Sequence, residues 1–209
     1  APEIKVRRLR ALGADVVQVG TTYAEALAES ADAAARPGAL GIHAYDAPGT
    51  VAGQGTVGVE LEEQARPDTV LVAVGGGGLM GGVATWFDGA VRIVAVEPRT
   101  SNALHQALAA GRPVATTPTG VAADSLGAST VGDIAFEVAR RTGVESVLVD
   151  DSDVVEARAW LWREVRVAAE PGGAAALAAL LSGVYVPDAG ERVAVIVCGA
   201  NADPSTLED

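Results

Sequence analysis

The stretch "VLVAVGGGGLMGG" (70–82) joins an apolar run directly to four consecutive glycines. A buried strand that ends in glycines and opens a helix can bind an anion through backbone N–H groups. Glycine allows positive φ and close backbone approach, and a helix N-terminus supplies free N–H donors and a favourable dipole. We therefore predict a phosphate-binding loop over Gly75–Gly78; the alternative is a glycine-rich turn needed only for tight helix–strand packing.

The spacing alone leaves the kind of phosphate open. A Walker loop requires a lysine after its glycines, and the only lysine of this chain is Lys5. The glycines match the dinucleotide pattern GxGxxG loosely, and Glu97 follows at about the distance, roughly 20 residues, where such folds place a ribose-binding carboxylate. A nucleotide-binding unit thus stays an alternative.

Two further side chains stand where chemistry is expected. Cys198 ends the apolar run "RVAVIVC" (192–198), and Glu170 precedes Pro171 at the start of a small-residue helix. Ligands of parallel sheets bind at the carboxyl ends of the strands, which favours a functional Cys198. A lone buried cysteine and a helix N-terminal carboxylate are the ordinary structural alternatives.

The elements that must position these residues alternate along the chain. Valine-rich runs at 15–20, 69–74, 91–98, 146–149 and 192–198 are separated by longer alanine-rich amphipathic segments. Such alternation predicts an α/β fold with a doubly wound, mostly parallel sheet buried on both faces. Turn residues near 38–49 interrupt the pattern, and we expect a partial small domain over 1–42 and a large domain over 43–209.

Composition excludes several classes of protein. The 209 residues carry a formal net charge of −12 and a single cysteine, which argue against a nucleic-acid binder and against a disulfide scaffold. Apolar runs fall short of the roughly 20 residues that cross a bilayer. We expect a cytoplasmic protein with no nucleic-acid or membrane partner.

Six motifs in order resemble the fold-type II pyridoxal-phosphate enzymes, with a tryptophan synthase β-like fold. The resemblance is to the threonine/serine dehydratases and the related serine racemases. It rests on "KVRRLRALGADVVQVG" (5–20), "HAYDAPGTVAGQGTVGVELEEQ" (43–64), "VGGGGLMGG" (74–82), "VAVEP" (94–98), "AAEPGGAAALAAL" (168–180) and "VIVCGANADPSTL" (195–207).

The resemblance implies a lyase that binds pyridoxal 5'-phosphate. It implies deamination of L-threonine or L-serine, small amino-acid substrates, to a 2-keto acid and ammonia. As protein partner we expect either a second copy, in a homo-oligomer, or the missing N-terminal segment. It places Cys198 at the pyridine nitrogen, Glu170 beside the cofactor ring, and the cofactor phosphate against Gly75, Gly76, Gly77, Gly78 and Leu79.

The chain also departs from the family pattern. The Ser-x-Lys-x-Arg-Gly motif with its Schiff-base lysine is absent, and Lys5 lies where the family has an unrelated lysine, so we expect no catalytic residue here. We interpret the chain as the C-terminal part of such an enzyme, inactive alone. The segment "EPRTSNAL" (97–104) lacks the carboxylates that the metal-binding members carry, and we expect no metal site. The alternatives are a non-catalytic phosphate-ligand binder, or a β/γ-replacing synthase or racemase of the same fold.

Overall fold

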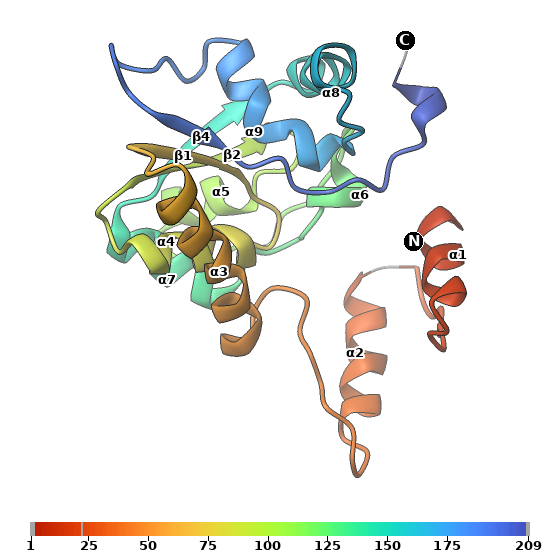
Figure 1. Cartoon of the computed structure of the whole chain (residues 1–209). Helices are drawn as coiled ribbons and strands as arrows, with labels where there is room; N and C mark the ends of the chain where they lie inside the picture. Colours follow the sequence, from red (N-terminus) through yellow and green to blue (C-terminus); the bar gives the residue numbers. More distant parts are fainter. Residues whose placement is uncertain (1–2, 22, 208–209) are drawn as a thin grey trace. The chain divides into compact units, whose positions relative to one another are not determined.

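The computed structural model describes residues 3–21 and 23–207, and the chain divides into two compact units, Ala1–His43 and Ala44–Asp209. The first unit holds helices α1 (Glu3–Ala11) and α2 (Tyr23–Ala34), drawn in red and orange in Figure 1. The strand predicted at 15–20 is wrong, because these residues form no regular element. A strand is stabilised by pairing with a neighbour, and the described residues of this unit contain no second strand.

The second unit is built on a four-stranded sheet in the order β3-β2-β1-β4. Its strands are β1 (Thr69–Ala73), β2 (Arg92–Pro98), β3 (Glu145–Val149) and β4 (Val193–Val195), and every pair is parallel. Leu71, for example, is in register with Val94 on β2 and Val195 on β4. The predicted doubly wound parallel α/β fold is confirmed.

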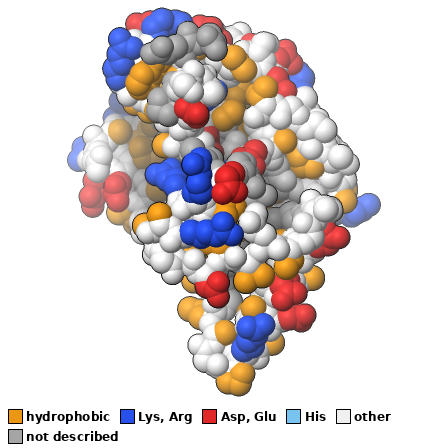
Figure 2. Space-filling view, turned by 90° about the vertical axis from the view of Figure 1, so that its right-hand side faces the viewer, with side chains coloured by type: hydrophobic (Ala, Val, Ile, Leu, Met, Phe, Trp, Pro, Cys, Tyr) orange, Lys and Arg blue, Asp and Glu red, His pale blue; other side chains and the backbone are white. Residues whose placement is uncertain are grey.

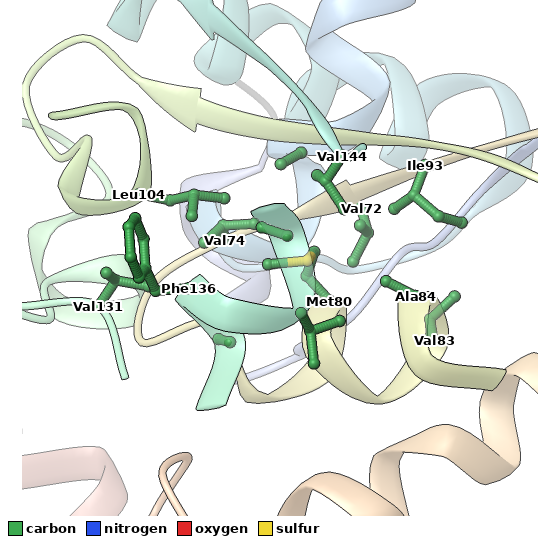
Figure 3. Close-up of a cluster of buried hydrophobic side chains, with 14 of the residues drawn as sticks. Val72, Val74, Met80, Val83, Ala84, Ile93, Leu104, Val131, Phe136 and Val144 are labelled. Atoms are coloured by element: carbon green, nitrogen blue, oxygen red, sulfur yellow. The ribbon is translucent and has the colours of Figure 1, made fainter. Parts of the chain in front are cut away.

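Alternate residues of β1 face two different cores, because side chains of a strand alternate between the faces of the sheet. Val70 and Val72 pack with Met80 and Phe136, in the cluster of Figure 3. Leu71 and Ala73 pack on the opposite face. The first face is covered by α4 (Gly78–Phe87), α5 (Ala103–Ala110) and α7 (Asp133–Thr142), and the second by α8 (Asp151–Val165) and α9 (Pro171–Leu181).

The remaining elements complete the second unit. Helix α3 (Pro48–Gln64) begins with a proline, which costs no hydrogen bond at the first helical position. A short helix α6 (Ala123–Leu126) lies between α5 and α7, and a 3₁₀ turn η1 (Pro204–Thr206) follows β4. Strand β4 is shorter than the predicted 192–198, because only Val193–Val195 pair with β1.

Charged side chains are dispersed on the surface. On the face shown in Figure 2, basic side chains are interspersed with acidic ones rather than gathered in one basic patch. Within the described residues, no helix has both the length and the apolar character required to cross a bilayer.

Candidate functional site

The glycine loop leads from the carboxyl end of β1 into α4. Gly77 is the N-cap of α4 and adopts a left-handed conformation with φ +89°, which side-chain-bearing residues rarely adopt. Valine and alanine upstream hold the strand between two cores, while the glycines allow the chain to turn sharply at its end. The predicted arrangement of strand, loop and helix start is present.

Backbone donors of this loop have no acceptor within residues 3–21 and 23–207. The first hydrogen bond within α4 runs from the N–H of Gly81 to the carbonyl of Gly77 (2.8 Å), so the N–H groups of residues 78–80 have none in the helix. No acceptor among the described residues receives a hydrogen bond from the N–H of Gly75, Gly76 or Gly77 either. A row of free N–H groups at a helix N-terminus fits a phosphate.

Close packing also requires these glycines. A Cβ on Gly76 would lie 2.2 Å from the ring of Tyr45, and one on Gly77 would lie 2.6 Å from the Cβ of Ala135. Tyr45 is held by a hydrogen bond from its hydroxyl to the carbonyl of Thr130 (3.2 Å). Tight packing and free N–H donors therefore occur together, and the two interpretations of the loop are compatible.

Glu170 and Cys198 lie at a second part of the same sheet edge. The N–H of Glu170, the N-cap residue of α9, donates to the carbonyl of Gly199 (3.1 Å). A Cβ on Gly173 would lie 2.6 Å from that same carbonyl oxygen, so α9 begins directly against the end of the β4 segment. Burial, together with the negative charge of Glu170, raises the pKa of the Cys198 thiol. The thiol is therefore neutral at pH 7.

Helix α6 connects the two parts of this edge. A Cβ on Gly75 would lie 3.0 Å from the Cα of Leu126, and one on Gly172 would lie 2.9 Å from the Cγ of the same leucine. The hydroxyl of Ser125 accepts the N–H of Gly172 (2.9 Å). The glycine loop and the start of α9 thus contact the same short helix. We name the set of Gly75–Leu79, α6, Glu170–Gly173 and Cys198–Gly199 the carboxyl-edge site.

Glu97 does not contribute to an open site. It is fully buried, and its two oxygens accept the N–H groups of Leu104 and His105 (2.8 Å each) at the start of α5. Burial raises the pKa of Glu97 to about 7, although the two N–H donors oppose that rise. Both oxygens are thus engaged inside the protein, and this contradicts the nucleotide alternative, in which Glu97 binds a ribose.

Two other features bear on ligand binding. Among the described residues there is no group of three or more His, Cys, Asp and Glu side chains that could hold a metal ion.

A cavity of about 690 Å³ lies between α3, α4 and α7, lined by apolar residues such as Val51, Val59 and Ile134 and by Trp86. The cavity does not include the carboxyl-edge site.

Sequence reasoning missed three residues of this region. Tyr45 lies in the motif 43–64, but nothing in its spacing indicates that its ring covers Gly76. Ser125 and Leu126 lie in a stretch with little periodicity. The aperiodic stretch between two strands, at the carboxyl edge of a parallel sheet, was the available signal, because such loops carry ligand contacts.

The fold is a parallel α/β fold with a glycine loop at the carboxyl edge of its sheet, and comparison with known proteins identifies its family. The model of the pyridoxal-phosphate dependent enzyme family matches residues 1–199, so the chain belongs to that family. Members of this family use pyridoxal 5'-phosphate as their cofactor. The predicted family and cofactor are confirmed.

Individual relatives cover the whole chain. It is 34% identical to the biosynthetic L-threonine dehydratase of Pasteurella multocida, over 99% of this chain and 41% of that protein. It is 32% identical to a serine racemase of Oryza sativa, over 99% of this chain and 63% of that protein. The chain therefore spans about two fifths to under two thirds of the length of these relatives.

Solved structures give the same result. Maize serine racemase superposes with a TM-score of 0.90 at 33% identity, over 99% of this chain and 65% of that one. Threonine deaminase isoform 2 of Solanum lycopersicum superposes with a TM-score of 0.87 at 33% identity, over 99% and 62%. The relatives thus include both ammonia-releasing and racemising enzymes.

Proposed function

We propose that these residues form the cofactor-phosphate-binding part of an enzyme that removes ammonia from L-threonine or L-serine. The observation that carries the proposal is the row of N–H groups at Gly75–Leu79, which have no acceptor among the described residues. The same edge holds Glu170 at the start of α9 and Cys198 in the segment after β4. The threonine dehydratases and ammonia-lyases among the relatives, at 31% to 37% identity, support the choice of reaction.

Each part of the carboxyl-edge site has a proposed role. The N–H groups of Gly75, Gly76, Gly77, Gly78 and Leu79 would hold the cofactor phosphate, and Glu170 and Cys198 would hold its pyridine ring, with Cys198 as the partner of the ring nitrogen. The bound cofactor withdraws electrons from the Cα of the amino acid. The backbone donors supply a fixed anchor without a side chain that could react.

The neutral thiol of Cys198 favours elimination. A thiol donates only a weak hydrogen bond, and burial with the nearby charge of Glu170 keeps this one protonated. It cannot hold the ring nitrogen as a cation, so the ring draws electrons less strongly. Elimination of a β-hydroxyl suits a weaker electron sink because the departing group takes the electron pair. We assign the reacting amine to no residue of this chain: its single lysine, Lys5, lies on α1.

Binding is tested on the chain itself with pyridoxal 5'-phosphate, pyridoxal and inorganic phosphate as probes. We expect the amide resonances of Gly75–Leu79 to shift with pyridoxal 5'-phosphate and phosphate but not with pyridoxal. The amides of Gly53 and Gly111, which have open space around them, serve as controls. Equal shifts with pyridoxal, or shifts outside the loop only, would overturn the proposed anchor.

Catalysis is tested on the product of the complete open reading frame that encodes these residues. With pyridoxal 5'-phosphate present, L-threonine or L-serine should yield a 2-keto acid and ammonia in equal amounts. Formation of D-serine without ammonia would make the protein a racemase, the second candidate that the serine racemase relatives support. Turnover of O-acetylserine or homoserine phosphate alone would make it a β- or γ-replacing synthase.

A further inference from the structure

Arg158 on α8 joins two chain segments that are distant in sequence. Its Nε donates to the carbonyl of Ala169 (2.9 Å), the residue before Glu170. Its Nη2 donates to the hydroxyl of Thr206 (2.6 Å), and its Nη1 contacts the carbonyl of Thr206 at 3.5 Å. One guanidinium therefore contacts both the turn that carries Glu170 and the tail that follows Cys198.

The contacts close into a ring. The N–H of Glu170 donates to Gly199, one residue after Cys198, and the chain then runs from Gly199 to Thr206 and back to Arg158. The far end of this tail is fixed, because Leu207 is buried and the N–H of Thr206 donates to the carbonyl of Asp203 (3.0 Å). Arg158 thus joins the two ends of this ring, Ala169 beside Glu170 and Thr206 on the tail after Cys198.

The acceptors of Arg158 lie 11 and 48 positions away in the sequence, whereas Arg112 and Arg166 donate to carbonyl oxygens within four positions. Arg92, Arg99, Arg163 and Arg192 each pair with a carboxylate. Within the described residues, Arg158 donates to neutral oxygens only. A planar guanidinium with five fixed donors can hold two separate segments in one geometry, which a flexible ammonium cannot.

We propose that Arg158 is a positioning residue that sets the distance between the Glu170 turn and the Cys198 strand end. The relevance of this distance to the cofactor rests on the proposed function. The effect of Arg158 on the distance is independent of that function, and it can be tested without any ligand.

The single cysteine makes the test direct, because every thiol signal of the chain comes from Cys198. The rate of its alkylation by iodoacetamide is measured in Arg158→Met and Arg158→Lys, with Arg163→Met as the matched control on the same helix. Within the part of the chain that the structure describes, the hydrogen bonds of Arg163 go to Glu156 and Glu164 of α8. We expect about a tenfold faster alkylation in Arg158→Met, the factor that corresponds to about 1.4 kcal/mol of easier local opening.

Arg158→Lys should lie between the wild type and Arg158→Met, and Arg163→Met should match the wild type. The faster alkylation should be insensitive to low urea concentrations, because local opening exposes little surface whereas global unfolding exposes much. Unchanged reactivity in Arg158→Met, an equal increase in Arg163→Met, or a steep urea dependence would each overturn the proposal.

A second variant covers the case in which Arg158→Met does not fold. Thr206→Val keeps the side-chain shape and removes the 2.6 Å acceptor, together with the hydrogen bond that the same hydroxyl donates to the carbonyl of Asp203 (2.8 Å). It should also raise the alkylation rate of Cys198. An unchanged rate would contradict the positioning role of Arg158. If the wild-type chain binds pyridoxal 5'-phosphate, the Arg158→Met variant should bind it about tenfold more weakly. If no chain binds it, the proposed function fails while the alkylation result stands.

Discussion

The two edges of the sheet are built in different ways. At the amino edge, charged side chains at the strand starts pair with one another: Arg92 forms two hydrogen bonds with Glu145 (2.7 Å each), and Asp68 accepts three from Arg192. At the carboxyl edge, the glycine loop and the start of α9 are held by backbone groups, closely packed glycines and the Ser125 hydroxyl, although the exposed Arg99–Asp150 pair (2.9 Å) also lies there. Among the described residues, no acceptor pairs with the N–H groups of Gly75–Leu79.

This difference separates stability from binding. The pairs of the amino edge involve side chains that are about half exposed, and such pairs each contribute little. The carboxyl edge has no room for an added methyl group at Gly75–Gly78, because neighbouring side chains or backbone occupy that space. We therefore expect single changes at the carboxyl edge to have larger effects than single changes at the amino edge.

The largest effect is expected for Gly77→Ala. The substitution places a side chain at φ +89° and a Cβ 2.6 Å from Ala135, which together should lower the free energy of unfolding by about 4 kcal/mol. Urea unfolding measures the change. Gly53→Ala on α3 is the control, because its Cβ meets open space and should stabilise the chain by about 0.5 kcal/mol. Similarly small changes in unfolding free energy in both variants would contradict the expectation that the carboxyl edge is the more sensitive one.

The next effect comes from Glu97 and depends on pH. Its folded pKa of about 7 exceeds the ordinary 4.5, so the stabilising contribution is complete below pH 4.5 and is lost as pH rises to 7. The loss amounts to about 3 kcal/mol. In Glu97→Gln this pH dependence should disappear.

The measurement is the difference in unfolding free energy between wild type and Glu97→Gln from pH 5 to 8. The carboxyls with lowered pKa values, Asp68, Glu145, Glu191 and Asp203, titrate below this window. A difference that stays constant over the window would show that Glu97 is ionised throughout.

A smaller effect is expected for Tyr185→Phe at the amino edge. The Tyr185 hydroxyl donates to Glu191 (2.5 Å), and its ring lies 5.3 Å from the Arg92 guanidinium. Glu191 keeps the Thr69 hydroxyl and the Asp188 N–H as donors, so the loss should be about 1 kcal/mol. Thermal unfolding measures it. A loss of unfolding free energy as large as that in Gly77→Ala would contradict the expectation that each contact at the amino edge contributes little.

The smallest effect is expected for Asp68→Asn. The Arg192 guanidinium lowers the pKa of Asp68 to about 2, so the carboxylate is charged at neutral pH, but the pair is exposed. We expect a minor loss of stability that diminishes at about 1 M salt, where screening acts over about 3 Å. Unfolding of both proteins at low and high salt tests this, and a large salt-independent loss would contradict it.

Local patterns in the sequence determined much of this protein. The buried strands at 69–74 and 91–98, the glycine loop and the helix start after Glu170 follow from residue types and short spacings, and the parallel sheet follows from their alternation. The prediction of a strand at 15–20 was wrong because local residue types alone do not make a strand. These residues favour an extended conformation, but a strand also needs a neighbouring strand to pair with.

Only the tertiary structure decided which residues meet at the carboxyl edge. Leu126 contacts both Gly75 and Gly172, and Arg158 donates hydrogen bonds to both Ala169 and Thr206. Glu97 accepts backbone N–H groups at the start of α5. These contacts join residues up to 51 positions apart on different elements, and no local period encodes them. The glycine loop whose backbone we propose as the phosphate anchor could be predicted from the sequence, whereas the side chains that hold it in place depend on how the layers pack.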